Sequence, residues 1–261
     1  MKFLPENIAG DPEALRRFKR EAQTASALNH PNICTIHDIG DNGGRPFIVM
    51  ELLEGQPLSR RISGNPLPHR ELIAIALQVT SALQALHSKG IVHRDIKSSN
   101  IFVSIDGHTK ILDFGLAKTN PQTPPDPPDA DAPTLGDSRT AIGSIAGTIS
   151  YMSPEQLLGQ ALDTRSDLFS FGIVLYEMAI GKLPFNEPTW TATANAIINT
   201  TPASVLAANP SVPQHLVAII DKALQKDPVR RYQTAADLRA DLSGSQTGWE
   251  VAQARPIGQS P

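Results

Sequence analysis

The chain has 261 residues, of which 40% are hydrophobic and 19% are charged, and its formal net charge is -3 at pH 7. This composition is typical of a globular protein, and the length is sufficient for one large domain or two lobes. The small negative charge provides no basic field, so we expect no nucleic-acid partner. The single cysteine, Cys34, excludes an intramolecular disulfide and fits a reducing compartment. We see neither a signal peptide nor an apolar run of membrane-spanning length, and therefore expect a cytoplasmic protein without a membrane segment.

The first third of the chain predicts two helices and a pair of strands. Residues 11–25 begin with an N-cap aspartate and a proline and carry apolar residues at helical spacing, which predicts a helix. Residues 34–37 and 46–50 are rich in β-formers and flank a turn expected at residues 41–44. A long helix is predicted from residue 69 to residue 87, because its apolar residues recur with the helical period.

Two further short strands, at residues 101–104 and 109–112, are predicted around the turn pair at residues 106–107. An antiparallel hairpin places the start of its first strand beside the end of its second. Asn100 precedes the first strand and Asp113 follows the second. We therefore expect these two side chains to meet at the open end of the hairpin.

The loop that leads into this hairpin adds Asp95 and Lys97 to the same region. Two carboxylates, an amide and an ammonium group would then converge on one patch. Carboxylate and amide oxygens suit Mg²⁺, which is commonly bound together with water and phosphate oxygens. The sequence therefore predicts a site that handles phosphate.

The second half of the chain combines an irregular segment with several helices. Residues 121–133 contain six prolines and three aspartates without apolar periodicity, which predicts an extended insert. A buried helix is expected from Asp167, as its cap, to about residue 180. Further helices are expected at residues 216–225 and 235–242, and residues 243–261 are rich in Gly, Gln, Ser and Pro, which predicts a linker or tail.

Several of these residues match one family pattern. The run His93-Arg94-Asp95-Ile96-Lys97-Ser98-Ser99-Asn100, followed by Asp113-Phe114-Gly115, is similar to the H-R-D-x-x-x-x-N and D-F-G motifs of protein kinases. Over residues 2–242 the chain resembles a bacterial, eukaryotic-like serine/threonine protein kinase. The resemblance implies an α+β, two-lobed fold with a complete, mainly helical C-terminal lobe. The family's Gly-rich loop precedes the position of Lys2 and is missing from this sequence, so we expect an incomplete N-terminal lobe.

The resemblance also implies a domain division and an activity. It places a truncated N-terminal lobe at residues 1–53, a C-terminal lobe at residues 54–242 and the tail at residues 243–261. The implied reaction is transfer of the γ-phosphoryl group of ATP to serine or threonine hydroxyls of proteins, with Mg²⁺. An alternative is a catalytically impaired kinase fragment that serves as a protein-interaction module. A small-molecule kinase is disfavoured, because the segments at residues 147–148 and 153–155 resemble those of protein-substrate kinases.

The resemblance assigns roles around the phosphates. Asp95 accepts or orients the proton of the substrate hydroxyl, and Lys97 steadies the γ-phosphate. Asn100 and Asp113 hold Mg²⁺ against the phosphates. Thr148 lines the acceptor site, and together with Lys97 it indicates Ser/Thr rather than Tyr specificity. The further ATP-binding positions that the resemblance implies are Lys2 with its ion-pair partner Glu21, then Met50, Glu51 and Leu53 at the adenine pocket and hinge, and Phe102.

Other residues are assigned to regulation and to structure. Arg94 precedes Asp95 in the arrangement with which the family uses a phosphorylated activation segment to order its site. Our hypothesis is that phosphate on Thr140 or Ser144 pairs with Arg94, which would involve a contact between two kinase molecules during autophosphorylation. The structural positions that the resemblance implies are an ion pair of Glu155 with Arg231, and Asp167, which should cap its helix and hold the backbone of the catalytic loop.

Overall fold

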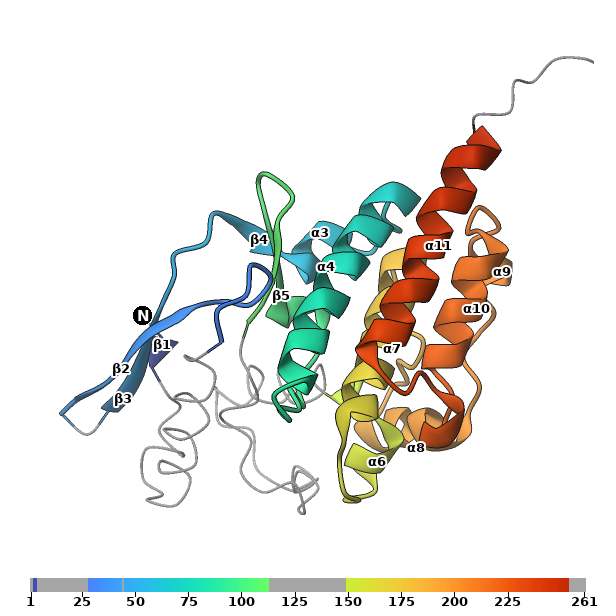
Figure 1. The fold of residues 1–261 in the computed structure, drawn as a ribbon. Coiled ribbons are helices and arrows are strands. Elements are labelled where there is room, and N and C mark those ends of the chain that lie inside the picture. The colour runs from blue at the N-terminus through green and yellow to red at the C-terminus, as the bar shows by residue number, and fades with distance from the viewer. Residues whose placement is uncertain (1, 4–27, 44, 113–148, 254–261) are drawn as a thin grey trace, which may run out of the picture.

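The computed structural model describes residues 2–3, 28–43, 45–112 and 149–253. The helix expected at residues 11–25 and the proline-rich insert lie outside these ranges. Two small sheets occupy one side of the molecule, and helices pack side by side on the other (Figure 1). In the described ranges, no helix combines the length and hydropathy that crossing a bilayer requires.

The first sheet is antiparallel and has the strand order β1-β3-β2. Its strands are β1 (Lys2–Phe3), β2 (Ile36–Asn42) and β3 (Arg45–Met50). The expected strand pair is confirmed, but the connection is shorter than the predicted turn. Because Asn42 pairs directly with Arg45, only two residues join β2 to β3. Such two-residue connections match the right-handed twist of paired strands.

The second sheet has the order β4-β5-β6 and includes the predicted hairpin. It consists of β4 (Gly55–Pro57), β5 (Ile101–Ser104) and β6 (Thr109–Ile111). Gly55 has a φ of 149°, and a Cβ on it would lie 2.3 Å from the carbonyl oxygen of Val103. Only glycine allows β4 to approach β5 this closely.

The helices form most of the remaining chain. In chain order they are α3 (Leu58–Ile62), α4 (His69–His87), η1 (Ser98–Asn100), α6 (Pro154–Leu157), α7 (Thr164–Ile180), α8 (Trp190–Asn199), α9 (Val205–Ala208), α10 (Gln214–Ala223), η2 (Pro228–Arg230) and α11 (Ala235–Gln253). The bounds of α4 agree with the prediction. This agreement is expected, because α4 has one apolar face toward the core and one polar face.

Helix α7 forms the centre of the core and is surrounded by α4, α10 and α9. Its side chains are buried over nearly the whole circumference, so it carries no polar face. A Cβ on Gly172 would lie 2.8 Å from the Cβ of Ala223 in α10. Gly172 therefore allows α7 and α10 to pack at close range.

Two of the helix boundaries that differ from the sequence-based expectation have a clear physical reason. The N-cap of α7 is Asp163, whose carboxylate accepts a hydrogen bond from the backbone N–H of Arg165, so Asp167 lies inside the first turn and does not cap the helix. Helix α11 continues to Gln253 instead of ending at Leu242. The apolar periodicity ends at Leu242, which is fully buried in the core. Once a helix is nucleated, further polar residues extend it at little cost.

Candidate active site

The loop from His93 to Asn100 joins α4 to β5 and carries the central carboxylate, Asp95. The Lys97 Nζ lies 3.1 Å from Oδ2 of Asp95. The Asn100 amide nitrogen donates to the same oxygen at 2.9 Å and to the backbone carbonyl of Asp95 at 3.0 Å. A cation and an amide therefore converge on Oδ2 and orient the carboxylate of Asp95.

The side chain of His93 is fully buried and makes hydrogen bonds that hold this loop in place. The backbone N–H of Asp95 donates to Nδ1 of His93 at 3.3 Å, and Nε2 of His93 lies 3.0 Å from the carbonyl oxygen of Leu112. Since Nδ1 accepts a hydrogen bond, the ring proton that reaches Leu112 is on Nε2. The imidazole thereby fixes Asp95 relative to the end of β6.

Arg94 has a left-handed backbone with φ of 66°, which is unusual for a residue with a side chain. Asp167 in α7 accepts hydrogen bonds at 2.8 Å from the backbone N–H groups of both His93 and Arg94, as expected for its role in holding the loop. The side chain of Gln156 donates to the carbonyl oxygen of Arg94 at 3.0 Å. Because both polar groups of this peptide segment are bound, the strained conformation is held from two sides.

Asp167 has one more partner, His87, which the sequence did not indicate. Nε2 of His87, the last residue of α4, lies 2.9 Å from Oδ2 of Asp167. The buried carboxylate thus has three hydrogen-bond partners, which offset the cost of removing it from water. The feature of the sequence that could have indicated this contact is the position of His87, at the end of the predicted helix and shortly before the loop that carries Asp95.

The expected ion pair of Glu155 and Arg231 is present and buried. Nη1 of Arg231 lies 2.7 Å from Oε1 of Glu155, and Nη2 lies 2.9 Å from Oε2. Ser166 donates to Oε1 at 2.7 Å, and the backbone carbonyls of Gln225 and Lys226 accept from the guanidinium. Burial acts to raise the pKa of Glu155, but the hydrogen bonds and charge of Arg231 outweigh it and lower the pKa below its usual value.

A second ion pair, which the sequence did not indicate, lies at the hinge after β3. Nζ of Lys110 in β6 is 2.7 Å from Oε1 of Glu51, and the backbone N–H of Thr35 donates to the same oxygen at 2.7 Å. Burial acts to raise the pKa of Glu51, while these hydrogen bonds lower it, and the net effect is a lowered pKa. The hinge is thus tied to the hairpin that follows the catalytic loop.

The other predicted nucleotide-binding positions flank this hinge. Met50 ends β3 and is half-buried against the core, and Leu53 is half-buried between β3 and β4. Phe102 lies in β5, where it pairs with Lys110 of β6. Lys2 lies in β1 opposite Ile48, so the strand that carries it is hydrogen-bonded to β3.

Several predicted site residues lie outside the described ranges: Glu21, Asp113, Thr140, Ser144 and Thr148. The nearest described position to Asp113 is Leu112, whose backbone N–H donates to the carbonyl of Asn100 at 2.8 Å. The end of the hairpin therefore pairs Asn100 with the residue before Asp113.

Among the described residues at this end of the hairpin, the side-chain oxygen of Asn100 is a donor of the kind that suits a hard cation. The side-chain nitrogen of Asn100 donates its hydrogen bonds to Asp95. The side-chain oxygen of Asn100 is therefore the atom that could act as a metal ligand. Amide and carboxylate oxygens are the ligands that Mg²⁺ prefers. In the part of the chain that the structure describes, no group of three or more His, Cys, Asp or Glu residues is placed to hold a metal.

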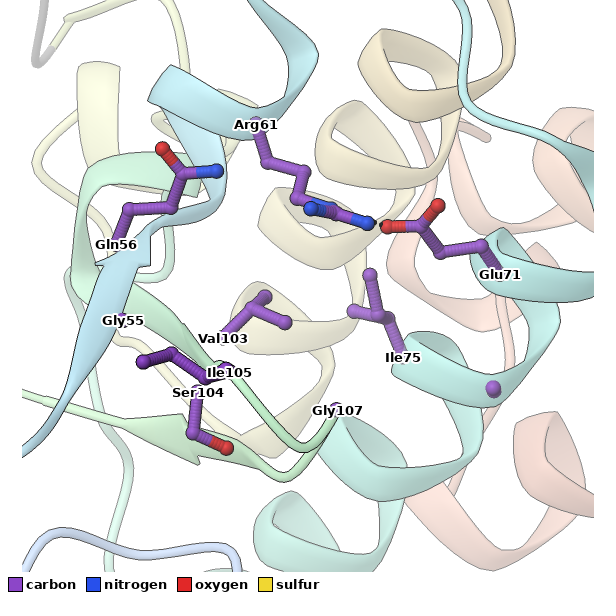
Figure 2. Close-up of a pocket in the computed structure, with 10 residues that line it drawn as sticks. Gly55, Gln56, Arg61, Glu71, Ile75, Val103, Ser104, Ile105 and Gly107 are labelled. Carbon is purple, nitrogen blue, oxygen red and sulfur yellow. Dashed lines mark hydrogen bonds and ion pairs between the residues drawn. The ribbon is translucent and has the colours of Figure 1, made fainter.

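A cavity of about 660 Å³ lies apart from this site (Figure 2). It is lined by Gly55, Gln56, Arg61, Glu71, Ala74, Ile75, Val103, Ser104, Ile105 and Gly107. Arg61 of α3 and Glu71 of α4 reach toward each other above Val103 and Ile75 and form an ion pair at 2.5 Å. None of the catalytic-loop residues lines this cavity.

Comparisons with known proteins agree with this geometry. The model of the protein kinase domain family matches residues 1–241. The chain is 40% identical over 243 residues to the serine/threonine-protein kinase PrkC of Bacillus subtilis and 39% identical over 247 residues to PknB of Mycolicibacterium smegmatis. These alignments cover 93% of this chain but only 35% and 38% of the two relatives, so the chain spans little more than a third of their length.

The fold is also that of solved kinase structures. The PknI kinase domain of Mycobacterium tuberculosis superposes with a TM-score of 0.69, covering 93% of this chain and 83–84% of the solved chains, at 24% identity. The expected α+β architecture, with small sheets and a mainly helical C-terminal part, is therefore confirmed. On the family match and this fold, the chain belongs to the protein kinase domain family.

Proposed function

We propose that this domain transfers the γ-phosphoryl group of ATP to serine or threonine hydroxyls of proteins, with Mg²⁺ as cofactor. The observation that carries the proposal is the convergence of Lys97 and Asn100 on one oxygen of Asp95. Phosphoryl transfer needs little covalent chemistry from the protein, so a few charges held in place are sufficient. The relatives PrkC and PknB are named serine/threonine-protein kinases, which supports serine and threonine as the acceptor residues.

In this proposal Asp95 handles the proton of the acceptor. Its carboxylate orients the hydroxyl and accepts the proton as the hydroxyl oxygen bonds to the γ-phosphorus. The bond from the γ-phosphorus to the bridging oxygen breaks, and ADP leaves with that electron pair. Lys97, held against Asp95, stabilises the negative charge on the transferred group.

The metal and nucleotide sides of the site follow from the same assignment. Asn100, through its amide oxygen, and Asp113 would hold Mg²⁺, which when bound neutralises charge on the phosphates. Lys2 would bind the phosphates and Glu21 would pair with it. Adenine would be held by the hinge residues 50–53, with Phe102 beside it.

The partners of the site are proteins in this proposal. Thr148 would line the acceptor site, and phosphorylated Thr140 or Ser144 would pair with Arg94 after transfer between two copies of the kinase. We place the domain in the cytoplasm, where ATP is available and where a buried thiol such as that of Cys34 stays reduced.

The test is Mg²⁺-dependent phosphate incorporation from labelled ATP, comparing the wild type with Asp95→Asn. A matched control is Asp221→Asn, because this aspartate is exposed on α10 and its carboxylate makes no hydrogen bond or ion pair within the described ranges. We expect Asp95→Asn to lose activity about 10²–10⁴-fold and Asp221→Asn to keep it. Absence of both incorporation and Mg–ATP binding in the wild type would refute the proposal and favour the interaction module.

A further inference from the structure

The cavity of Figure 2 lies between β4, the β5–β6 hairpin, α3 and α4, and no residue assigned to the proposed reaction lines it. Its volume of about 660 Å³ is within the range of cavities that hold small molecules. Such sites combine an apolar lining with a few polar groups that fix the orientation of the ligand. The side chains that line this cavity therefore indicate the chemistry of a ligand that fits it.

The inner wall of the cavity is apolar. Val103 of β5 and Ile75 of α4 form this wall and are 7% and 2% exposed. Ile105, in the turn after β5, also lines the cavity but is 83% exposed, which places it at the open edge. A single exposed apolar residue is common, but this one continues an apolar wall. The three side chains offer a surface to the apolar part of a ligand.

The charged side of the cavity is formed by Arg61 of α3 and Glu71 of α4, which meet above Val103 and Ile75 (Figure 2). Nε of Arg61 donates to Oε1 of Glu71 at 2.5 Å. Within the described ranges, Nη1 and Nη2 of Arg61 and Oε2 of Glu71 make no hydrogen bond. Two donor nitrogens and one acceptor oxygen are therefore available beside each other.

These two opposite charges restrict the class of ligand. A simple anion is attracted by Arg61 and repelled by Glu71, and a simple cation meets the reverse. A zwitterion that carries its carboxylate and ammonium on one carbon atom can bind both side chains. Its carboxylate accepts from Nη1 and Nη2 of Arg61, and its ammonium donates to Oε2 of Glu71. An α-amino acid has this arrangement, and the apolar wall selects one with a large apolar side chain.

The ion pair itself does not oppose such binding. The side chains of Arg61 and Glu71 are 45% and 26% exposed. A pair in contact with solvent contributes little to stability, so the two side chains can adjust around a ligand at small cost. Because the ligand brings one charge of each sign, no uncompensated charge is buried when it binds.

We propose that this cavity is a binding site for a free α-amino acid with a large apolar side chain, such as leucine or phenylalanine. The ligand's charged end binds Arg61 and Glu71, and its side chain packs on Val103 and Ile75 with Ile105 at the edge. This site goes beyond the proposed phosphoryl transfer and does not depend on it. A bound amino acid would contact β4, which follows the hinge, and β5, which follows the catalytic loop.

The first test compares ligands by isothermal titration calorimetry with the full chain. L-phenylalanine and L-leucine are the probes, and each control ligand lacks one feature. 3-Phenylpropionate lacks the ammonium, 2-phenylethylamine lacks the carboxylate, and L-alanine lacks the large apolar side chain. We expect one saturable site for both probes and binding about tenfold weaker or more for each control ligand. Each loses either a charge-assisted hydrogen bond or an apolar contact.

The second test uses variants of the cavity. Arg61→Gln and Glu71→Gln each remove one charge, and Ala74→Phe fills the cavity from an exposed position without changing its charge. Arg60→Gln is the matched control, because Arg60 is exposed on the same helix and does not line the cavity. The Kd for L-phenylalanine should rise about tenfold or more in the three cavity variants and stay within twofold in the control.

The outcomes decide the proposal even if a charge variant folds poorly, because the ligand comparison uses the wild type and Ala74→Phe keeps the ion pair. Absence of saturable binding of both probes to the wild type would overturn it. Equal affinity for L-phenylalanine and 3-phenylpropionate would overturn the zwitterion as ligand class. An unchanged Kd in Ala74→Phe would show that the amino acid binds elsewhere. A wild type that binds L-phenylalanine but transfers no phosphate would refute the proposed function and leave this site standing.

Discussion

Glu155 and Arg231 are 76 positions apart in the chain, yet the carboxylate of one and the guanidinium of the other pair through two parallel hydrogen bonds of 2.7 and 2.9 Å. Both side chains are almost inaccessible to water, with exposed fractions of 7% and 0%. The pair joins α6, which follows the activation segment, to the loop before α11. Its role is structural, because the described contacts of the two side chains, with each other and with Ser166, Gln225 and Lys226, do not include Asp95.

Removing one partner of this pair should destabilise the protein strongly. Arg231→Met leaves the carboxylate of Glu155 buried without its counter-ion, and we expect a loss of about 3–5 kcal/mol in the free energy of unfolding. Urea denaturation measures the change. Arg230→Met is the control, because the side chain of Arg230 is 76% exposed and its ion pair with Asp227 spans 3.9 Å. Equal losses in the two variants would contradict a special role for the buried pair.

The hinge ion pair of Glu51 and Lys110 should give a pH-dependent stability. The folded state lowers the pKa of Glu51, so its contribution is present above the unfolded pKa near 4.5 and is lost as the pH falls through the folded value. Glu51→Gln should therefore be less stable than the wild type at pH 7, and the difference should shrink at pH 3. Urea midpoints at both pH values test this, with the exposed Glu54→Gln as control. A difference that persists at pH 3 would show that charge is not its cause.

Two glycines in helices should respond in opposite directions to alanine. In Gly172→Ala the new Cβ would lie 2.8 Å from Ala223, so α7 and α10 must separate, and we expect a loss of about 1–3 kcal/mol. Gly244 in α11 has no atom within 4 Å of an added Cβ. Gly244→Ala should therefore raise stability by about 0.5–1 kcal/mol through helix propensity. Thermal unfolding measures both, and a stable Gly172→Ala protein would show that α10 is free to move.

The amide of Asn100 should control the metal requirement of the proposed reaction. Chelation of Mg²⁺ with EDTA should abolish transfer, and Asn100→Ala should raise the Mg²⁺ concentration for half-maximal activity about tenfold or more. Asn195→Ala is the control, because Asn195 is exposed on α8 and its side-chain oxygen accepts a hydrogen bond from Asn199. An unchanged Mg²⁺ requirement in Asn100→Ala would remove this residue from the metal site.

Local patterns in the sequence were sufficient for the elements that carry the site. The amphipathic period of α4 predicted its bounds, because one face of that helix is buried and the other is not. The turn between residues 101–104 and 109–112 predicted the β5–β6 hairpin. The motif spacing brought Asp95, Lys97 and Asn100 together, since all three lie within one short loop.

Only the tertiary structure decided which distant side chains meet. His87 contacts Asp167 across 80 positions, Lys110 contacts Glu51 across 59, and Ser98 contacts Glu177 across 79. Periodicity reports which face of an element is buried, but it contains no information about which element covers that face. The start of α7 and the end of α11 differed from the prediction for a related reason. The position of a helix cap depends on backbone geometry, and polar residues at the end of a helix become helical because the helix before them has already formed. The sequence by itself thus determined the family, the long helix α4 and the β5–β6 hairpin, and it placed Asp95, Lys97 and Asn100 in one short loop, whereas the packing around α7 decided how that loop is held.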